Sequence, residues 1–350
     1  MYSFKNDYCE GGHPRILQAL LETNMQQEEG YGLDRHSLNA QAILRELVGD
    51  SHAGVHFLSG GTQTNLTAIC AFLRPHEACI AAKTGHIATH ESGAIEATGH
   101  KVLTVETDDG KLTPELIAPV LTEHHFEHMV KPAMVYISCP TELGTVYTRA
   151  ELERLYAFCQ EKNLILYADG ARLGSALATE EAGLTLHAMY EFTDAFFIGG
   201  TKGGALLGEA LILKNADLKE EIRYLIKQRG ALLSKGRILG IQLETLFEDG
   251  LYVELAAHAN AMAQKMAKGL KKAGCDFFIH SPTNQIFPIF PNAVIDTLLT
   301  KFGFYTWAAV DETHSAVRLI TSWATPERSV DAFLGAYKEA MATHQETLHA

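Results

Sequence analysis

One lysine stands among small residues at the end of an apolar run. The run from Ala195 to Ile198 is typical of a buried strand, and it leads into Gly199-Gly200-Thr201-Lys202-Gly203-Gly204. Four glycines around Lys202 leave no bulky neighbour to fill the space, so the pattern favours a ligand beside the amine. A partly desolvated lysine has a lowered pKa and can act as a nucleophile. A surface lysine in a turn is the alternative on this run alone.

An aspartate closes an earlier apolar run. Asp169 follows Leu164 to Ala168 and precedes Gly170-Ala171-Arg172, and ligands of α/β proteins bind where such strands end. A nucleophilic lysine forms Schiff bases with aldehydes, and pyridoxal 5′-phosphate (PLP) is the commonest aldehyde cofactor. PLP needs a carboxylate against its pyridine nitrogen, so we predict PLP on Lys202 with Asp169 in that role. A helix cap paired with Arg172 is the alternative for Asp169.

Two other turns could complete a PLP site. The stretch Ser59-Gly60-Gly61-Thr62-Gln63-Thr64-Asn65 joins a predicted strand to a predicted helix. Glycine backbone and a helix N-terminus favour an anion, so Gly61 and Thr62 could hold a phosphate, although such residues often serve only as a cap. His86, in Gly85-His86-Ile87-Ala88-Thr89-His90-Glu91, follows another predicted strand and could stack on a planar cofactor. A hydrogen-bonded histidine without that role is the more frequent alternative.

The roles of other arginines and histidines are less clear from the sequence. Arg172 could bind a substrate carboxylate through two parallel hydrogen bonds. Arg318 lies inside the apolar run Val317 to Ile320, and a buried guanidinium must be paired. It therefore binds a substrate carboxylate or closes an internal salt bridge. His124-His125-Phe126-Glu127-His128 has its acidic residue in the wrong place for a zinc protease, so we expect a solvated helix end and no metal.

Strands and helices alternate along the chain as far as about residue 240. We expect strands at 55–58, 78–82, 101–105, 134–138, 164–168, 195–198 and 210–213. Alternation of this kind predicts an α/β fold with a mainly parallel sheet and helices on both faces. Residues 1–240 would form a large PLP-binding domain, and residues 241–350 a smaller C-terminal α+β domain.

Local signals set the limits of several helices. Thr148 and Glu151 have the spacing of a capping box, and Gly274 is placed to end a long helix over 252–273. Further helices are expected over 37–48, with Leu47 facing inward, and over 91–98.

Composition excludes some classes of partner. The chain has 350 residues, of which 47% are hydrophobic and 20% charged, as in an ordinary globular enzyme. Its formal net charge of −13 argues against nucleic acid and anionic membranes as partners. No apolar run reaches membrane-spanning length, and the first residues lack the core of a signal peptide. Six scattered cysteines without a CxxC motif favour a reducing, cytoplasmic setting.

Together these stretches resemble the threonine aldolase/β-eliminating lyase family of PLP enzymes, which has the aspartate-aminotransferase-type fold (fold type I). The likeness runs from Asn6-Asp7 to Arg318, nearly the whole chain, and Asp-Gly-Ala-Arg followed by Lys-Gly is its most specific part. The roles that the resemblance implies are a Schiff-base lysine, Lys202; a partner of the pyridine nitrogen, Asp169; phosphate ligands, Gly61 and Thr62; a stacking residue, His86; and substrate-binding residues, Arg172, Arg318 and Asn6. The resemblance also implies a homodimer or homotetramer, with Tyr31 near a neighbouring subunit's site.

The chain departs from the family's pattern in two loops. Typical threonine aldolases have a histidine near the substrate hydroxyl, where this chain reads Ser138-Cys139-Pro140-Thr141-Glu142. A Gly-rich Met-Arg segment expected near residue 232 is also missing, so Arg229 or Lys235 would supply charge to the phosphate. The departures leave the cofactor residues intact and put the substrate in question.

The resemblance implies a PLP-dependent lyase that cleaves β-hydroxy-α-amino acids. We expect a low-specificity L-threonine aldolase, which converts threonine to glycine and acetaldehyde, with Lys202, His86 and Asp169 as its catalytic residues. His86, Lys202 or a water would take the hydroxyl proton. The alternative with the same cofactor is β-elimination from serine, cysteine or an aromatic amino acid. A non-catalytic relative that acts as a binding protein is the alternative of another class.

Overall fold

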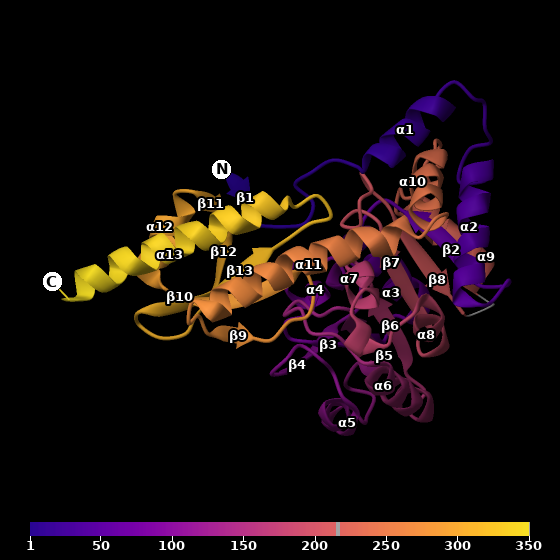
Figure 1. The fold of residues 1–350 in the computed structure, drawn as a ribbon. Helices are drawn as coiled ribbons and strands as arrows, with labels where there is room; N and C mark the ends of the chain where they lie inside the picture. Colours follow the sequence, from indigo (N-terminus) through magenta and orange to yellow (C-terminus); the bar gives the residue numbers. More distant parts are fainter. Residues whose placement is uncertain (215–217, 350) are drawn as a thin grey trace.

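Two lobes share one long helix. The structure is a computed structural model that describes residues 1–214 and 218–349. Helix α11 (Leu251–Lys272) runs from the large lobe into the small one (Figure 1). It begins in the core of the large lobe with Tyr252 and Leu255, and ends in the core of the small lobe with Met266 and Leu270.

A seven-stranded mixed sheet forms the centre of the large lobe. Its strand order is β2-β8-β7-β6-β5-β3-β4. The bounds of these strands are β2 Gly54–Leu58, β3 Glu77–Ala82, β4 Val102–Val105, β5 Lys131–Ser138, β6 Ile165–Asp169, β7 Ala195–Gly199 and β8 Glu209–Leu213. Neighbours from β7 to β4 are parallel, while β8 is antiparallel to both β7 and β2. The expected mainly parallel sheet is therefore confirmed, with one antiparallel strand inserted near its edge.

Helices cover both faces of this sheet. Alternate side chains of β5 enter different cores: Val135 and Ile137 enter one, Met134 and Tyr136 the other. The helices of this lobe are α1 Pro14–Thr23, α2 Arg35–Val48, α3 Gly61–Phe72, α4 His86–Thr89, α5 Pro114–Glu123, α6 Arg149–Glu161, α7 Leu173–Leu177, α8 Leu186–Glu191, α9 Leu218–Gln228 and α10 Arg237–Phe247. Short 3₁₀ turns occupy Glu96–Thr98 and Glu180–Ala182.

Helix boundaries agree with the sequence where capping residues set them. Thr148 and Glu151 form the expected capping box at the start of α6. The continuous helix expected over 91–98 is wrong. Ser92 and Gly93 both have positive φ, 53° and 73°, which an α-helix cannot continue through, so only a 3₁₀ turn follows.

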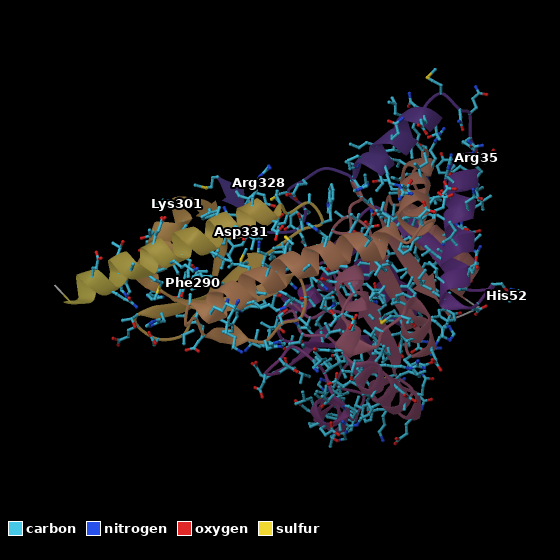
Figure 2. All side chains as sticks on the ribbon, in the orientation of Figure 1. Arg35, His52, Phe290, Lys301, Arg328 and Asp331 are labelled. Atoms are coloured by element: carbon cyan, nitrogen blue, oxygen red, sulfur yellow. The ribbon has the colours of Figure 1, made fainter. Side chains whose placement is uncertain are left out.

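The small lobe is built on an antiparallel sheet, against which the end of α11 and two further helices pack. The strand order is β12-β13-β10-β9, with bounds β9 Phe277–Ile279, β10 Gln285–Pro291, β12 Tyr305–Ala309 and β13 His314–Ile320. Helices α12 (Asn292–Leu299) and α13 (Glu327–His349) pack around a core that contains Phe290, fully buried and labelled in Figure 2. Strand β1 (Tyr2–Ser3) pairs with β11 (Phe302–Gly303), which brings Phe4 into the same core. None of the helices that the structure describes is long and apolar enough to cross a membrane.

The residues expected to do chemistry follow the ends of adjacent parallel strands. His86 follows β3, the loop 138–142 follows β5, Asp169 ends β6 and Lys202 follows β7. Because parallel strands end at one edge of a sheet, the fold brings these residues together there. The division of the chain at residue 240 stays a prediction.

Candidate active site

A buried glutamate holds the turn that carries Lys202. Glu209, only 4% exposed at the start of β8, accepts hydrogen bonds from the Gly200 backbone N–H and the Thr201 hydroxyl, each at 2.9 Å. Burial raises the pKa of Glu209 to about 7, although the Thr201 hydrogen bond and the Lys202 charge oppose this shift. A Cβ on Gly203 would lie 2.6 Å from the Tyr252 ring, so glycine lets the turn approach α11 closely. The turn is therefore fixed on both sides of Lys202.

The Lys202 amine lies in a pocket with two charged neighbours, Asp7 and Arg172. Tyr252 and Trp323 line the same pocket. Burial and the positive charge of Arg172 lower the pKa of Lys202, while nearby carboxylates act in the opposite direction. A lysine whose pKa is lowered in this way is a better nucleophile near neutral pH.

Asp169 has three hydrogen-bond donors around its carboxylate. Oδ2 accepts from Asn65 Nδ2 at 2.9 Å and from the Tyr136 hydroxyl at 2.7 Å, and Oδ1 accepts from the Ala171 N–H at 2.9 Å. All three partners donate, as an acceptor-only carboxylate requires. Asp169 is 5% exposed, so its orientation is set by these neighbours. A carboxylate fixed in this way suits the pyridine nitrogen of PLP.

His86 belongs to the same hydrogen-bonded group. Its Nδ1 lies 2.8 Å from Glu91 Oε1, which also accepts from Asn65 Nδ2 at 2.8 Å. Asn65 thus links His86, through Glu91, to Asp169. Its own carbonyl oxygen accepts from the Tyr167 hydroxyl at 3.0 Å. The structure therefore brings together two residues that the sequence proposed separately.

The start of α3 lies beside this group and has backbone N–H groups without a partner among the described residues. Gly61 is the first residue of the helix, and no side chain caps its N-terminus. A Cβ on Gly60 would meet nothing within 4 Å, so the backbone is open there. Arg229 adjoins this turn, because its carbonyl accepts from Gln63 Nε2 at 3.2 Å. Arg229 Nε is buried and has no hydrogen-bond partner within the described part of the chain. Open helix N–H groups and a buried unpaired guanidinium nitrogen fit a phosphate.

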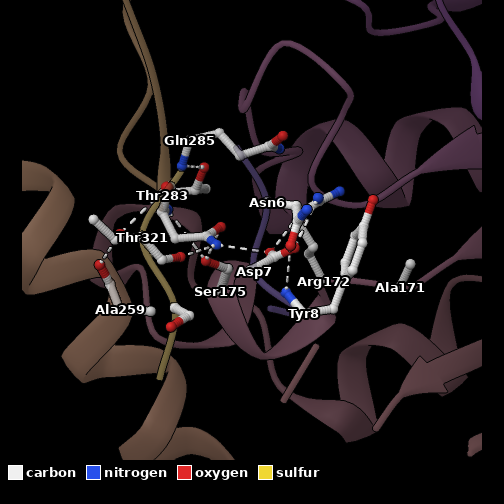
Figure 3. A network of polar contacts seen from close by, with 12 residues as sticks. Asn6, Asp7, Tyr8, Ala171, Arg172, Ser175, Ala259, Thr283, Gln285 and Thr321 are labelled. Carbon is white, nitrogen blue, oxygen red and sulfur yellow. Dashed lines mark hydrogen bonds and ion pairs between the residues drawn. The ribbon is translucent and has the colours of Figure 1, made fainter. Parts of the chain in front are cut away.

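Arg172 makes a bidentate ion pair with a residue far away in the sequence (Figure 3). Its Nε and Nη2 donate to the two oxygens of Asp7 at 2.7 and 3.0 Å. Asn284 Nδ2 donates to Asp7 Oδ2 at 2.9 Å, so the small lobe also holds this carboxylate. Burial would raise the pKa of Asp7, but the charges of Arg172 and Lys202 outweigh it and lower that pKa. The edge of the Arg172 guanidinium that Nε and Nη2 form is thus already bonded to Asp7.

Asn6 lies beside this ion pair with its own amide engaged locally. Its Oδ1 accepts from the Tyr8 backbone N–H and from the Cys9 thiol, both at 3.1 Å. Figure 3 shows Asn6 next to Asp7 and Arg172 at the site. The amide nitrogen is therefore the group that Asn6 could offer to a substrate.

Arg318 has no carboxylate partner among the described residues. Its guanidinium lies over the Trp307 ring, 5.0 Å from the centroid, and its Nε is buried without a hydrogen bond. Burial and the charge of Arg172 lower the pKa of Arg318, and Asp7 acts in the opposite direction. Of the two interpretations of Arg318, an internal salt bridge is therefore not found in the described part of the chain. A half-buried guanidinium without an ion pair, near Arg172, suits an external carboxylate.

Four residues that complete the site have no predicted role: Asn65, Glu91, Tyr136 and Glu209, whose side chains make its hydrogen bonds. Glu142 is expected, with Thr141, to orient a water, and the structure shows its other contacts. Glu142 Oε1 accepts from the His86 backbone N–H at 2.9 Å and from the Ser138 hydroxyl at 2.6 Å. Thr141 is 1% exposed and bonded to Thr145 and the Asp109 carbonyl, away from these groups. A pattern of strand ends cannot reveal such partners, since Asn65 and Tyr136 lie inside a helix and a strand.

Comparison with known proteins agrees with this geometry. The chain belongs to the β-eliminating lyase family, whose model matches residues 4–291. It is 33% identical to the low specificity L-threonine aldolase of Pseudomonas sp. (strain NCIMB 10558), over 93% of this chain and 94% of that protein. The protein of the same name from Pseudomonas aeruginosa is 32% identical, over 92% and 93%.

A solved structure of Leishmania major threonine aldolase superimposes with a TM-score of 0.95. The two chains are 49% identical, and the match covers 97% of this chain and 99% of the other. The expected fold, a large α/β lobe and a smaller C-terminal lobe of the aspartate-aminotransferase type (fold type I), is thereby confirmed, as is the expected family.

Proposed function

We propose that this protein is a PLP-dependent carbon–carbon lyase that acts as a low-specificity L-threonine aldolase. It would cleave L-threonine and related β-hydroxy-α-amino acids to glycine and an aldehyde. One observation carries the proposal: Lys202, whose pKa is lowered, shares its pocket with Arg172 and lies close enough to Asp169 for the two charges to interact. The full-length similarity to the Pseudomonas and Leishmania proteins supports the same activity.

The residues of this chain suit PLP group by group. Lys202 would bind its aldehyde carbon, and Asp169 would face its pyridine nitrogen. His86 would cover the ring, while Gly61, Thr62 and Arg229 would hold the phosphate. When bound, PLP supplies an acceptor for the electron pair that is left on Cα when a bond to Cα breaks.

Two arginines would bind the amino-acid carboxylate from opposite lobes. Arg172 is held by Asp7 along one edge and keeps its other edge for a ligand. Arg318 on β13 has an unpaired buried nitrogen. Binding the carboxylate at both would orient the bonds of Cα, and the Lys202 amine can move the proton at Cα.

Product identification tests the activity. Purified protein loaded with PLP is incubated with L-threonine, L-allo-threonine, L-serine and L-cysteine, and products are identified by chromatography and mass spectrometry. Glycine with acetaldehyde from the two threonines supports aldol cleavage. Ammonia with a 2-oxo acid as the main products, and no glycine, would assign the protein to β-elimination instead. Absence of any visible cofactor band after loading would favour a binding protein.

We also infer that the protein is a homodimer or homotetramer. Large apolar side chains are exposed on the first part of the chain: Leu17, Leu21, Met25, Tyr31, Leu33, Leu38 and Leu47. The prediction that Leu47 faces inward is wrong, because Val48 takes the buried position and Leu47 is 42% exposed. Monomeric proteins seldom expose so many apolar side chains together. Light scattering should give at least twice the mass of one chain, and Leu21→Glu should lower it.

A cytoplasmic location is a further proposal. The six cysteines are all free, and four of them are buried. Burial raises the pKa of the Cys139 and Cys159 thiols to about 12, so these thiols are unreactive. A protein that keeps six reduced cysteines suits a reducing compartment. Cell fractionation with an antibody to the protein tests the location.

A further inference from the structure

His90 extends the site beyond the residues already described. It follows the last residue of α4, and its backbone N–H donates to the His86 carbonyl at 2.9 Å. The two imidazole rings are stacked, with centroids 5.5 Å apart and planes inclined by 17°. The His90 side chain is accessible to solvent, so a small molecule can reach it.

The surroundings of His90 connect it to the substrate-binding groups. Partial burial lowers the pKa of His90, and the positive charges of four residues act in the same direction: His86, Arg318, Arg172 and Lys202. These residues come from α4, β13, the segment after β6 and the turn after β7. The imidazole therefore lies within electrostatic reach of both carboxylate-binding arginines and of the amine, and it is neutral at pH 7.

Hydrogen bonding at Thr89 accommodates a His90 that carries its proton on Nδ1. The Thr89 hydroxyl lies 3.1 Å from the Gly85 carbonyl, which accepts its single hydrogen. The same oxygen is hydrogen-bonded to His90 Nδ1, and while its hydrogen is directed to Gly85 it accepts there. In this tautomer Nε2 of His90 presents a lone pair.

We propose that His90 Nε2 is the general base that takes the β-hydroxyl proton of the substrate. The assignment rests on the aldol cleavage proposed above. The electron pair of the O–H bond forms the second bond of the aldehyde C=O, and the pair of the Cα–Cβ bond stays with Cα. Cα then gains a proton to give glycine, and His90 releases the proton it took to solvent, so the protons balance.

Other polar groups near this point are engaged elsewhere. The loop after β5 has no histidine, and its Glu142 accepts from the His86 backbone and from Ser138. Thr141 is bonded to Thr145. The Nδ1 of His86 is bonded to Glu91 within the group that holds Asp169. The Nε2 of His86 is not used by these contacts, but its ring is assigned to cover the cofactor, so His90 is the neighbouring imidazole left for the β-hydroxyl.

The variant His90→Asn tests the role. An asparagine amide can donate to Thr89 Oγ1 in place of Nδ1–H, but it has no basic nitrogen. In the PLP-loaded protein, kcat/KM for cleavage of L-threonine should fall by about 10²- to 10⁴-fold, the usual contribution of a general base. The cofactor spectrum should not change. The exposed histidine variant His125→Asn is the matched control and should behave as wild type.

A reaction without a β-hydroxyl separates this role from damage to the site. Exchange of the Cα hydrogen of glycine in D₂O, followed by NMR, needs Lys202 and the cofactor but no base at Cβ. His90→Asn should exchange glycine at the wild-type rate. In the wild type, kcat/KM for threonine should decline on the acid side with an inflection below pH 6.5, the ordinary histidine value, and His90→Asn should lack that inflection.

Two results would overturn the assignment. One is cleavage by His90→Asn within about threefold of wild type; the other is an equal loss of cleavage and glycine exchange, which would indicate a structural role. A wild-type protein that exchanges glycine but releases no aldehyde from any β-hydroxy amino acid would refute aldol cleavage itself, and this inference with it.

Discussion

Replacing Asp169 with asparagine removes one charge while keeping the shape of the side chain. In the structure the carboxylate accepts three hydrogen bonds, from Asn65, Tyr136 and the Ala171 N–H. An asparagine whose carbonyl takes the place of Oδ2 keeps the bonds from Asn65 and Tyr136. Its amide nitrogen then faces the Ala171 N–H, so one bond to a charged acceptor is lost, at a cost of about 1.5–3 kcal/mol in stability.

The effect on turnover should exceed this local cost. A fixed charge placed where charge changes during reaction is worth about 3 kcal/mol or more, and each 1.36 kcal/mol is tenfold in rate. We therefore expect kcat for threonine cleavage by Asp169→Asn to fall by about 150-fold or more, with PLP still bound. Steady-state kinetics with an aldehyde-coupled assay measure the fall, and the absorption spectrum reports cofactor binding.

A matched substitution separates charge from folding. Asp194, just before β7, accepts from the Leu166 N–H at 2.8 Å at the opposite end of the same sheet. Asp194→Asn should lose stability but keep normal turnover. If Asp169→Asn retained turnover within about threefold of wild type, a role for Asp169 at the pyridine nitrogen would be refuted.

Three further predictions follow from the same pocket. Lys202→Ala should lose both the visible band of the bound cofactor and all cleavage, measured by absorption and product assay. Arg172→Lys or Arg318→Lys should raise KM for amino acids at least tenfold with an unchanged cofactor spectrum, because a lysine cannot form the bidentate fork. Asp7→Asn should destabilise the fold by about 3–5 kcal/mol in urea unfolding, since it removes the buried charge that pairs with the largely enclosed Arg172. The pKa of Asp7 is lowered, so the stability that its charge contributes is complete above pH 3.8 and is lost only as the pH falls further. Between pH 5 and 8 the free energy of unfolding should therefore not change through Asp7.

Surface residues of the same types provide the controls. Lys301 lies on the small lobe, where Figure 2 labels it, and the variant Lys301→Ala should keep the cofactor band. Arg149→Lys alters an exposed ion pair with Glu191 and should leave KM unchanged. Asp249→Asn alters the exposed ion pair with Arg15 and should lower the free energy of unfolding by less than about 1 kcal/mol.

A Lys202→Ala protein that kept the visible cofactor band would place the cofactor on another lysine. An unchanged KM in both arginine variants would refute the proposal that Arg172 and Arg318 bind the substrate carboxylate.

Much of the site could be predicted because it depends on strand ends. Parallel strands deliver whatever follows them to one edge, so Asp169, Lys202 and His86 could be associated without coordinates. Their buried partners could not be found in the same way. Asn65 is a polar residue on an otherwise ordinary helix, and only the packing of α3 over the sheet shows that its amide reaches both Glu91 and Asp169.

The elements that were missed or misplaced also have physical reasons. Strand β12 has mostly exposed residues on both faces, so it lacks the apolar alternation by which strands are recognised. The contact between Asp7 and Arg172 depends on an N-terminal segment that crosses to the small lobe, where β1 pairs with β11. No local pattern specifies that path, and the occupied edge of Arg172 could not be anticipated.

The loop after β5 lacks the histidine that the resemblance to threonine aldolases implies, and it contributes to the proposed site in another way. Burial and the charge of Asp169 raise the pKa of Glu142, and its carboxylate holds the first residue of α4 through the His86 N–H. The loop therefore holds the start of the helix that carries His86 and is followed by His90. Because His90 lies one turn after His86, a base at this position would stay next to the substrate. On the proposal that His90 is the base, the loop without a histidine and His90 are two parts of one arrangement.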